Sequence, residues 1–263
     1  MRATLGGAAI EYDARGAGPA VLLLHAFPLG LFMWDVQAEA WSQRHRVVRF
    51  DARGFGGTPS EAEPLTMDHI ADDGAALLGL LGVETAVVVG CSMGGYAAFS
   101  FVRRHADRLA GLVLQDTRAA ADTPEGRSGR GVLASRVLTE GASVAVEAFL
   151  PKLVGETTKR QNPALVAHLR ERILATSTRG IAHALRGLGD RPDSRETLGQ
   201  IRVPTLVVVG EEDVLTPPAE AEAMAGAIPG GRLVVIPKAG HLCNLENPSV
   251  YDEAVRPFLD TLR

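Results

Sequence analysis

A serine stands at the centre of a G-x-S-x-G pentapeptide, residues 90–94. A continuous, mostly β-branched run, residues 86–89, comes directly before it, and a helical pattern begins near Gly95. A strand that passes straight into a helix makes a sharp, strained turn, which tolerates only small neighbours and exposes the serine hydroxyl. The helix also directs its positive amino end at this turn. The pattern therefore predicts Ser92 as a catalytic nucleophile, with the backbone N–H of Met93 as one donor to an oxyanion.

A serine hydroxyl needs a base near neutral pH, and the chain offers seven histidines. His241 follows an apolar run, residues 233–236, and lies in a glycine-containing loop where a strand would end. Five of the other histidines lie in or beside helical patterns, and His25 belongs to a separate loop. We therefore predict His241 as the base.

An acid that orients this histidine should follow another strand and precede His241 in the chain. Asp213 comes shortly after an apolar run at residues 205–209. Asp116 follows the preceding run, residues 111–114, and is the alternative. We favour Asp213, whose carboxylate would hold the imidazole tautomer and stabilise the imidazolium that forms during attack.

The loop after an earlier strand, residues 20–24, supplies the second expected oxyanion donor. This donor is the backbone N–H of Phe27, while His25 is expected to brace the same loop by hydrogen bonds. Trp34 is a candidate for the substrate pocket, and a packed core position is the alternative. The sequence contains neither a metal-binding histidine or cysteine motif nor a phosphate-binding GxxxxGK loop. We therefore expect no metal.

Strand-length apolar runs alternate with helix-length amphipathic segments towards both ends of the chain. Strands are expected at residues 8–12, 20–24, 47–50, 86–89, 111–114, 205–209 and 233–236. Helices are expected at residues 67–81, 95–105, 218–227 and 248–262. Such alternation predicts an α/β fold with a mostly parallel sheet that is covered by helices on both faces.

Residues 118–200 interrupt this alternation. They contain no convincing strand, but they hold helical patterns near residues 127–140, 143–154, 163–177 and 181–188. A single crossover rarely needs about 80 residues. We therefore predict an all-helical cap at residues 118–200, inserted into a catalytic core formed by residues 1–117 and 201–263. A cap at the strand ends would cover the place where ligands bind in such sheets.

Composition narrows the class of protein. The chain has 263 residues, of which 46% are hydrophobic and 22% are charged, as in folded globular proteins. A net charge of −4 without a run of basic residues argues against nucleic-acid binding. Residues 85–102 carry no charge, but their central glycines fit a strand–turn–helix better than a membrane span. Because no apolar leader is visible, we expect a soluble, cytoplasmic protein.

Taken together, these segments resemble an α/β-hydrolase-fold serine hydrolase. The resemblance rests on the Ser92 pentapeptide and on residues 25–28, 51–56, 210–213 and 240–241. Residues 33–35 and 51–54 are most similar to the 3-oxoadipate enol-lactonase and carboxylesterase branch. The resemblance implies an eight-stranded sheet and cofactor-free hydrolysis of a small carboxylic ester or lactone through a Ser92 acyl-enzyme. Usual members have glycine where this chain has Ala26.

Other functions are compatible with the same residues. Perhydrolysis of the haloperoxidase type, C–C bond hydrolysis and acyl transfer can use the same triad, and a ligand-binding protein can keep the fold. An intact triad argues against the last of these. The expected partner is a small ester or lactone rather than nucleic acid or membrane, and the sequence leaves the oligomeric state open. Arg127, Arg130 and Arg136 could bind a substrate carboxylate, but we assign them to the solvated surface.

Overall fold

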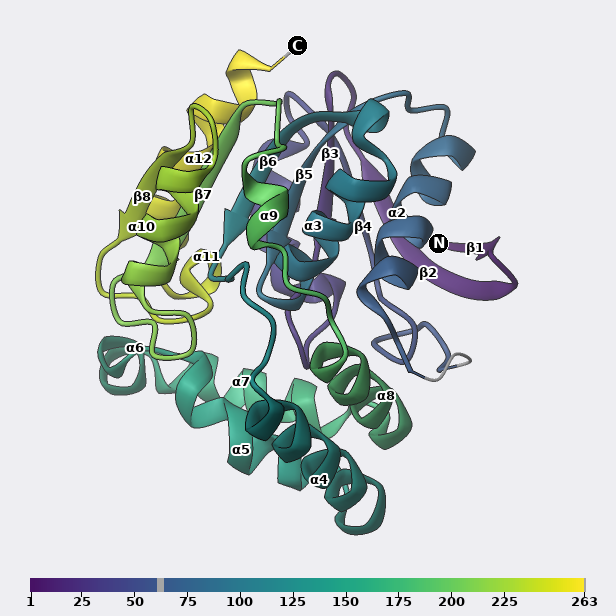
Figure 1. The fold of residues 1–263 in the computed structure, drawn as a ribbon, viewed down its shortest axis with the longest axis vertical. Coiled ribbons are helices and arrows are strands. Elements are labelled where there is room, and N and C mark those ends of the chain that lie inside the picture. Colours follow the sequence, from purple (N-terminus) through teal and green to yellow (C-terminus); the bar gives the residue numbers. More distant parts are fainter. Residues whose placement is uncertain (61–63, 263) are drawn as a thin grey trace.

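The computed structural model describes residues 1–60 and 64–262, and an eight-stranded sheet runs through its upper part (Figure 1). The strands are Arg2–Leu5 (β1), Ala8–Arg15 (β2), Ala20–Leu24 (β3), Arg46–Phe50 (β4), Ala86–Cys91 (β5), Leu109–Gln115 (β6), Thr205–Gly210 (β7) and Arg232–Ile236 (β8). Their order is β1-β2-β4-β3-β5-β6-β7-β8. Only β2 pairs antiparallel, with β1 and β4. The predicted α/β architecture with a mostly parallel sheet is therefore confirmed.

The central strands are apolar along their whole length because both faces of the sheet are covered. Every residue of β3, β5 and β7 is buried. All seven predicted strands lie within observed ones. The eighth observed strand, β1, was not predicted. It is a short edge strand that is half exposed and pairs only with β2, so its sequence lacks an apolar run.

Two layers of helices cover the sheet. The core helices are Asp35–Trp41 (α1), Met67–Leu80 (α2), Met93–Arg104 (α3), Arg195–Leu198 (α9), Pro218–Ala227 (α10), Cys243–Glu246 (α11) and Pro248–Thr261 (α12), with short 3₁₀ turns at Leu31–Trp34 (η1) and Ala106–Arg108 (η2). Helix α1 packs against α12, whereas α2, α3, α9 and α10 pack in series on the other face (Figure 1). Within the described residues, no helix is both long and apolar enough to cross a bilayer.

Five further helices follow β6 and precede β7 in the sequence, and they lie below the sheet in Figure 1. They are Pro124–Glu140 (α4), Ser143–Leu153 (α5), Glu156–Gln161 (α6), Pro163–Leu174 (α7) and Thr178–Gly189 (α8). All of residues 116–204 are described, and none of them forms a strand. The chain returns to the core before residue 200, since α9 packs against α3 and α10. The helices over the strand ends therefore stop at Gly189.

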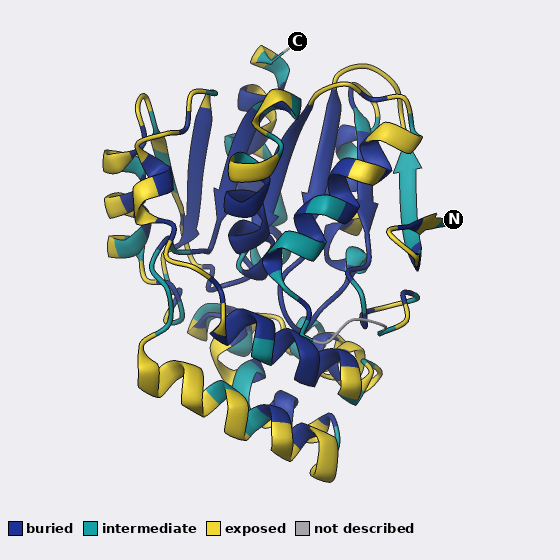
Figure 2. Cartoon of the chain, turned by 45° about the vertical axis from the view of Figure 1, so that its right-hand side comes forward, coloured by how far each residue is buried: buried dark blue, intermediate teal, exposed yellow. Residues whose placement is uncertain are grey.

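Helix α8 is the member of this group that packs against loops of the core. Two of its glycines allow its backbone to approach those loops closely. A Cβ atom at Gly180 would lie 2.0 Å from the carbonyl oxygen of Gly54, and one at Gly187 would lie 1.7 Å from that of Leu65. Helix α4 packs on α8 and exposes much of its own surface. Figure 2 shows the result, with dark-blue strands above and helices that are yellow on their outer faces below. Within these five helices, burial is therefore greatest in α8, next to the core, and much smaller in α4.

Candidate active site

The turn between β5 and α3 holds Ser92 in a strained conformation. Its backbone has φ 53° and ψ −109°, a region that residues with side chains rarely adopt. A Cβ atom at Gly90 would lie 2.3 Å from the carbonyl oxygen of Gly94, and one at Gly94 would lie 2.1 Å from that of Leu24. Both flanking glycines are therefore required by the packing of this turn. The local sequence folds into the strand–turn–helix that the pentapeptide predicts.

Loops from three strands bring a hydroxyl, an imidazole and a carboxylate into series. Ser92 Oγ lies 2.8 Å from His241 Nε2, and His241 Nδ1 lies 2.8 Å from Asp213 Oδ2. Ser92 follows β5, Asp213 follows β7 and His241 follows β8, so the three groups meet at the carboxyl edge of the sheet. His241 and Asp213 are almost completely buried. This geometry permits proton transfer from the hydroxyl to the imidazole.

The carboxylate of Asp213 is fixed by its own loop. Its Oδ1 accepts hydrogen bonds from the N–H groups of Leu215, at 2.8 Å, and Thr216, at 3.0 Å. Its Oδ2 also accepts a 2.6 Å hydrogen bond from the Thr216 hydroxyl. Burial raises the pKa of Asp213, but the charge of His241 and the hydrogen bonds from His241 and Thr216 outweigh it, so the pKa lies below its ordinary value. Asp213 is therefore an ionised acceptor at neutral pH.

The electrostatics favour the protonated imidazole that an attack on a carbonyl would create. Burial lowers the pKa of His241, but the charge and hydrogen bond of Asp213 outweigh it and raise the pKa above its ordinary value. Asp116 and Glu246 add smaller contributions in the same direction. A base of this kind accepts a proton readily and holds it beside a carboxylate.

The alternative acid, Asp116, lies one strand away and has different partners. Its Oδ1 accepts a 2.8 Å hydrogen bond from the N–H of Gly210, and its Oδ2 accepts bonds from Gln115 Nε2 and the N–H of Cys243. Burial, and then the charge of Asp213, raise the pKa of Asp116 to about 7. Asp116 therefore ties the ends of β6 and β7 together, whereas Asp213 contacts the imidazole.

The two expected oxyanion donors are available. Neither the N–H of Phe27 nor that of Met93 has a hydrogen-bond acceptor within residues 1–60 and 64–262. The Phe27 loop is held by His25, whose Nε2 accepts a 3.0 Å bond from the N–H of Ala52. Its Nδ1 therefore carries the proton and donates to the Ala26 carbonyl at 3.0 Å. Burial lowers the pKa of His25, which keeps it neutral in this bracing position.

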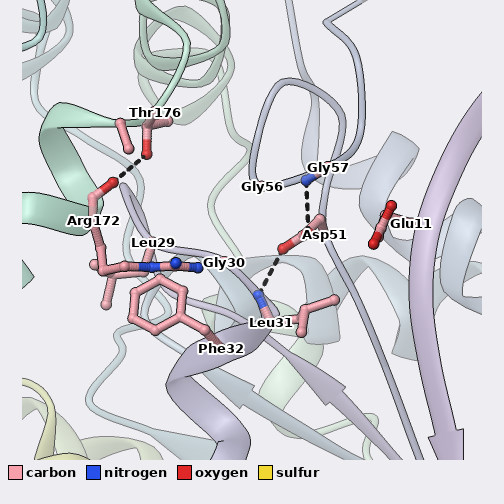
Figure 3. A pocket seen from close by; sticks show the side chains of 11 residues that line it. Glu11, Leu29, Gly30, Leu31, Phe32, Asp51, Gly56, Gly57, Arg172 and Thr176 are labelled. Atoms are coloured by element: carbon pink, nitrogen blue, oxygen red, sulfur yellow. Dashed lines mark hydrogen bonds between the residues drawn. The ribbon is translucent and has the colours of Figure 1, made fainter. Parts of the chain in front are cut away.

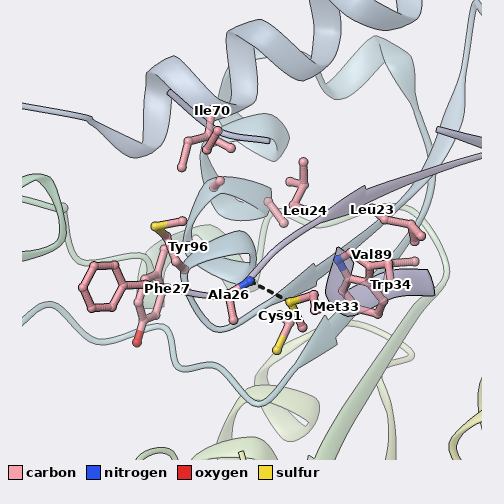
Figure 4. Packing of buried hydrophobic residues seen from close by; sticks show 14 of the residues in the cluster. Leu23, Leu24, Ala26, Phe27, Met33, Trp34, Ile70, Val89, Cys91 and Tyr96 are labelled. Carbon is pink, nitrogen blue, oxygen red and sulfur yellow. Dashed lines mark hydrogen bonds between the residues drawn. The ribbon is translucent and has the colours of Figure 1, made fainter. Parts of the chain in front are cut away.

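Figure 4 shows the packing beneath the site, and it corrects the expectation for Trp34. The indole has no exposed surface and does not line the cavity at Ser92, because η1 turns it into the core. Ala26 is also fully buried, and its N–H donates to Met33 Sδ at 3.1 Å. Cys91 is a buried neighbour of Ser92. Sequence could not separate a pocket tryptophan from a core one.

A cavity of about 60 Å³ opens at Ser92. Its lining is Phe27, Ser92, Tyr96, Arg118, Arg130, Phe149, Leu153, Leu188, Leu215, Thr216 and His241. Most of these side chains are apolar or aromatic, and Phe27 and Phe149 make an edge-to-face contact with ring centroids 5.1 Å apart. The assignment of Arg130 to the solvated surface is wrong, since its side chain is 19% exposed and faces this cavity.

Glu246 was not identified from the sequence, although it joins the His241 loop to the turn between α5 and α6. Its Oε1 accepts from the N–H groups of Gly240, at 2.9 Å, and Leu242, at 3.1 Å. Its Oε2 accepts a 2.7 Å bond from the N–H of Gly155. Residues 155 and 246 are far apart in the chain, so no local pattern could have indicated this contact. Glu246 therefore ties the loop of His241 to the start of α6.

A second hollow, of about 340 Å³, lies away from Ser92 where α7 meets the loops after β3 and β4 (Figure 3). Asp51 lies at its wall and accepts hydrogen bonds from the N–H groups of Leu31 and Gly57. The guanidinium of Arg172 stacks over the Phe32 ring at 4.1 Å. Asp51 and Arg172, two charged residues of this hollow, are therefore already engaged with the neighbouring loops. Nowhere within the described residues do histidine, cysteine and acidic side chains cluster as a metal site would require.

Comparison with known proteins identifies the family of the chain. A family model described as the alpha/beta hydrolase fold matches residues 19–248. The chain belongs to this family. The match spans β3 to the start of α12 and includes all three residues of the hydrogen-bonded series.

Individual relatives cover almost the whole chain. An esterase from Thermogutta terrifontis, solved with malate bound, superimposes with a TM-score of 0.97 at 41% identity and covers 100% of this chain and 98% of its own. The enol-lactonase from Burkholderia xenovorans LB400 gives a TM-score of 0.92 at 30% identity, with coverage of 99% and 100%. The 3-oxoadipate enol-lactonase 1 of Acinetobacter baylyi is 27% identical over 254 residues, or 97% of this chain and 93% of that protein.

Proposed function

We propose that the protein is a serine hydrolase that cleaves a small carboxylic ester or lactone through an acyl-enzyme on Ser92. The observation that carries this proposal is the series of two 2.8 Å contacts from Ser92 through His241 to Asp213. Its position at a strained turn, under a cavity whose walls are largely apolar and aromatic, is the arrangement that acyl transfer requires. The likeness to an esterase and to enol-lactonases supports this choice of substrate bond.

The first half of the reaction forms the acyl-enzyme. Ser92 Oγ attacks the carbonyl carbon while His241 Nε2 takes the hydroxyl proton. Asp213 stabilises the resulting imidazolium, and the N–H groups of Met93 and Phe27 donate to the oxyanion. The tetrahedral intermediate then collapses. The bond to the leaving oxygen breaks, and His241 returns the proton to that oxygen.

The second half repeats these steps with water. His241 takes a proton from a water molecule, whose oxygen attacks the acyl carbon. The new tetrahedral intermediate breaks its bond to Ser92 Oγ, and the imidazolium returns the proton to that atom. A carboxylic acid is released, and the enzyme is restored. For a lactone, the leaving hydroxyl and the acid belong to one molecule.

The helices above the strand ends would act as a cap that determines which esters enter. Phe149 and Leu153 of α5 and Leu188 of α8 line the same cavity as Ser92. Such apolar walls exclude water and strengthen the oxyanion hydrogen bonds. Because the cavity is small, the proposed substrates have short acyl groups.

Covalent labelling with a fluorophosphonate tests the proposal. The expected result is one adduct, located on Ser92 by peptide mass spectrometry, together with turnover of short-chain methyl esters. Cys91 is the adjacent alternative nucleophile, so an adduct there, or on any residue other than Ser92, would contradict the assignment. Ester turnover that survives complete labelling would also contradict it.

A further inference from the structure

Two arginines line the cavity at Ser92, and the proposed mechanism uses neither of them. Arg118 lies a few residues beyond β6, and Arg130 lies on α4. Their side chains are 31% and 19% exposed. Both are held by Asp122, whose side chain is 3% exposed. The arginines therefore have defined positions at the wall of the cavity.

Asp122 provides one negative charge for three guanidinium groups. Arg191 Nη1 lies 2.8 Å from Asp122 Oδ1, Arg130 Nε donates to Oδ2, and Arg118 Nη2 lies 3.4 Å from Oδ1. Burial raises the pKa of Asp122, but the hydrogen bonds and charges of Arg130 and Arg191 outweigh it and lower the pKa. The carboxyl is therefore ionised at neutral pH. The cluster has two positive charges in excess.

Arg191 has a structural role in this cluster. Its Nη1 also donates to the Leu188 carbonyl at 2.7 Å, and its Nη2 donates to the Ala120 carbonyl at 3.1 Å. The guanidinium stacks over the Tyr96 ring, 4.2 Å from the centroid, and the side chain is 2% exposed. Arg191 therefore contributes one of the three positive charges, but it does not line the cavity. Arg118 and Arg130 both line it, so the excess positive charge of the cluster lies beside Ser92.

Arg118 in particular has unused donors. A guanidinium carries five N–H donors, and the Nε of Arg118 is buried with no partner among the described residues. Leaving a charged donor unpaired away from water is costly. Within residues 1–60 and 64–262, no carboxylate side chain lines this cavity. An anionic group on a bound molecule would supply the missing acceptor.

We infer that Arg118 and Arg130 form a carboxylate-binding subsite, so that the preferred substrate is an ester or lactone carrying a carboxylate a short chain away from the bond that is cleaved. Guanidinium groups match the planar, two-oxygen geometry of a carboxylate. The short chain follows from the volume, about 60 Å³, that Ser92 and both arginines share. This inference rests on the proposed function, since it names the substrates of the same site.

Matched pairs of substrates test the subsite. Monomethyl succinate and methyl 4-methylpentanoate differ only by a carboxylate in place of an isopropyl group on the acyl side. Acetoxyacetate and isobutyl acetate differ in the same way on the alcohol side. We expect kcat/KM to favour the anionic member of one pair by about 10- to 100-fold, since charge-assisted hydrogen bonds have this worth. The pair that responds identifies the side of the ester that faces the arginines.

Variants of the arginines assign that preference to residues. Arg118→Gln and Arg130→Gln should each reduce the ratio of kcat/KM between the paired substrates by about tenfold. Arg136→Gln is the matched control, because Arg136 lies on the same helix but its exposed side chain pairs with Glu140. It should leave the ratio unchanged. Unfolding temperatures show whether each variant is folded. If a variant is not folded, the ratio of kcat/KM between the paired substrates in the wild type still decides whether the subsite exists.

The outcomes separate this inference from the proposed function. Turnover of neutral esters without a preference for either anionic substrate would overturn the subsite and leave the hydrolase intact. An anionic preference that survives in the folded arginine variants would also overturn it. If no ester is cleaved and Ser92 is not labelled, the proposed function fails. In that case, calorimetry with succinate still tests the subsite, because wild type should bind it more tightly than Arg118→Gln.

Discussion

The carboxyl edge of the sheet and the helices that cover it, α4–α8, are held in different ways. At the edge, Ser92, Asp213 and His241 are fixed by backbone turns and short hydrogen bonds, and glycines leave no room for change. In α4–α8, the cavity wall consists of side chains whose outer neighbours face solvent (Figure 2).

This difference separates the reaction from the choice of substrate. Under the proposed function, a group at the edge can be replaced only with loss of the reaction, because its position within fractions of an ångström determines proton transfer. A side chain of α4–α8 would contact parts of the substrate that do not react. Substitutions in the two regions should therefore differ in kind, and the following predictions test that distinction.

Ser92→Ala should have the largest effect. Removal of the nucleophile should lower kcat for a short methyl ester by at least about four orders of magnitude, leaving only binding and oxyanion assistance. Circular dichroism and the unfolding temperature should show an intact fold. Residual turnover within tenfold of wild type would place the nucleophile elsewhere.

The two aspartates should differ sharply. Asp213→Asn should lower kcat by about three to four orders of magnitude, because the amide cannot hold the required imidazole tautomer. Asp116→Asn, the matched control one strand away, should reduce kcat only severalfold. Steady-state kinetics on the same ester compares them. The reverse order would identify Asp116 as the acid.

Glu246→Gln tests the contact between the two regions. An amide has one acceptor oxygen, so at least one of the N–H groups of Gly155, Gly240 and Leu242 would lose its partner. We expect a loss of about 1–3 kcal/mol in the free energy of unfolding and a roughly tenfold fall in kcat. Chemical denaturation and kinetics measure the two effects. Glu253→Gln, on an exposed position of α12, should change neither.

Phe149→Ala should alter selectivity rather than chemistry. The phenyl ring lies in the cavity wall against Phe27, so its removal should enlarge the space for the acyl chain. The ratio of kcat/KM for hexanoate over acetate esters should rise severalfold, because about one to two extra methylenes would be buried. A uniform loss on both esters would show that the cap shapes the reaction itself.

The smallest expected effect is on the pH profile. His241 must be neutral to accept a proton, so kcat/KM should fall as the pH drops through its raised pKa, above the ordinary value of 6.5. The charge of Asp116 contributes to that raised pKa. Asp116→Asn should therefore move the acid limb to lower pH by a fraction of a unit. A shift to higher pH would contradict this electrostatic account.

The sequence predicted what local patterns encode. The turn at Ser92 and the ends of α2, α3, α10 and α12, to within two residues, follow from periodicity and glycine positions. The order of serine, acid and histidine then selected the groups that meet at the sheet edge. Helix α1 was missed because seven residues offer too short a pattern.

Contacts between distant segments could not be predicted in the same way. The local sequence around Arg130 and Glu246 does not indicate their contacts, and that around Trp34 fits a pocket position and a core position alike. The contacts of Arg130 and Glu246 depend on how α4 and the turn near Gly155 pack on the strand ends, which no single segment encodes. Trp34 is buried because η1 turns it into the core. The assignment of catalytic roles to Ser92 and its partners remains a prediction until it is measured.

The pairing of α4 with α8 has a consequence for how the chain folds. Strands β6 and β7 are neighbours, and Leu112 pairs with Thr205, so their pairing closes a loop of roughly 90 residues. The entropy lost on closing a loop grows with its length. A chain in which α4 and α8 have already packed on each other has only two connecting segments left to close, residues 116–123 and 190–204. In that order of folding, the helix pair would lower the entropic barrier to joining the two halves of the sheet.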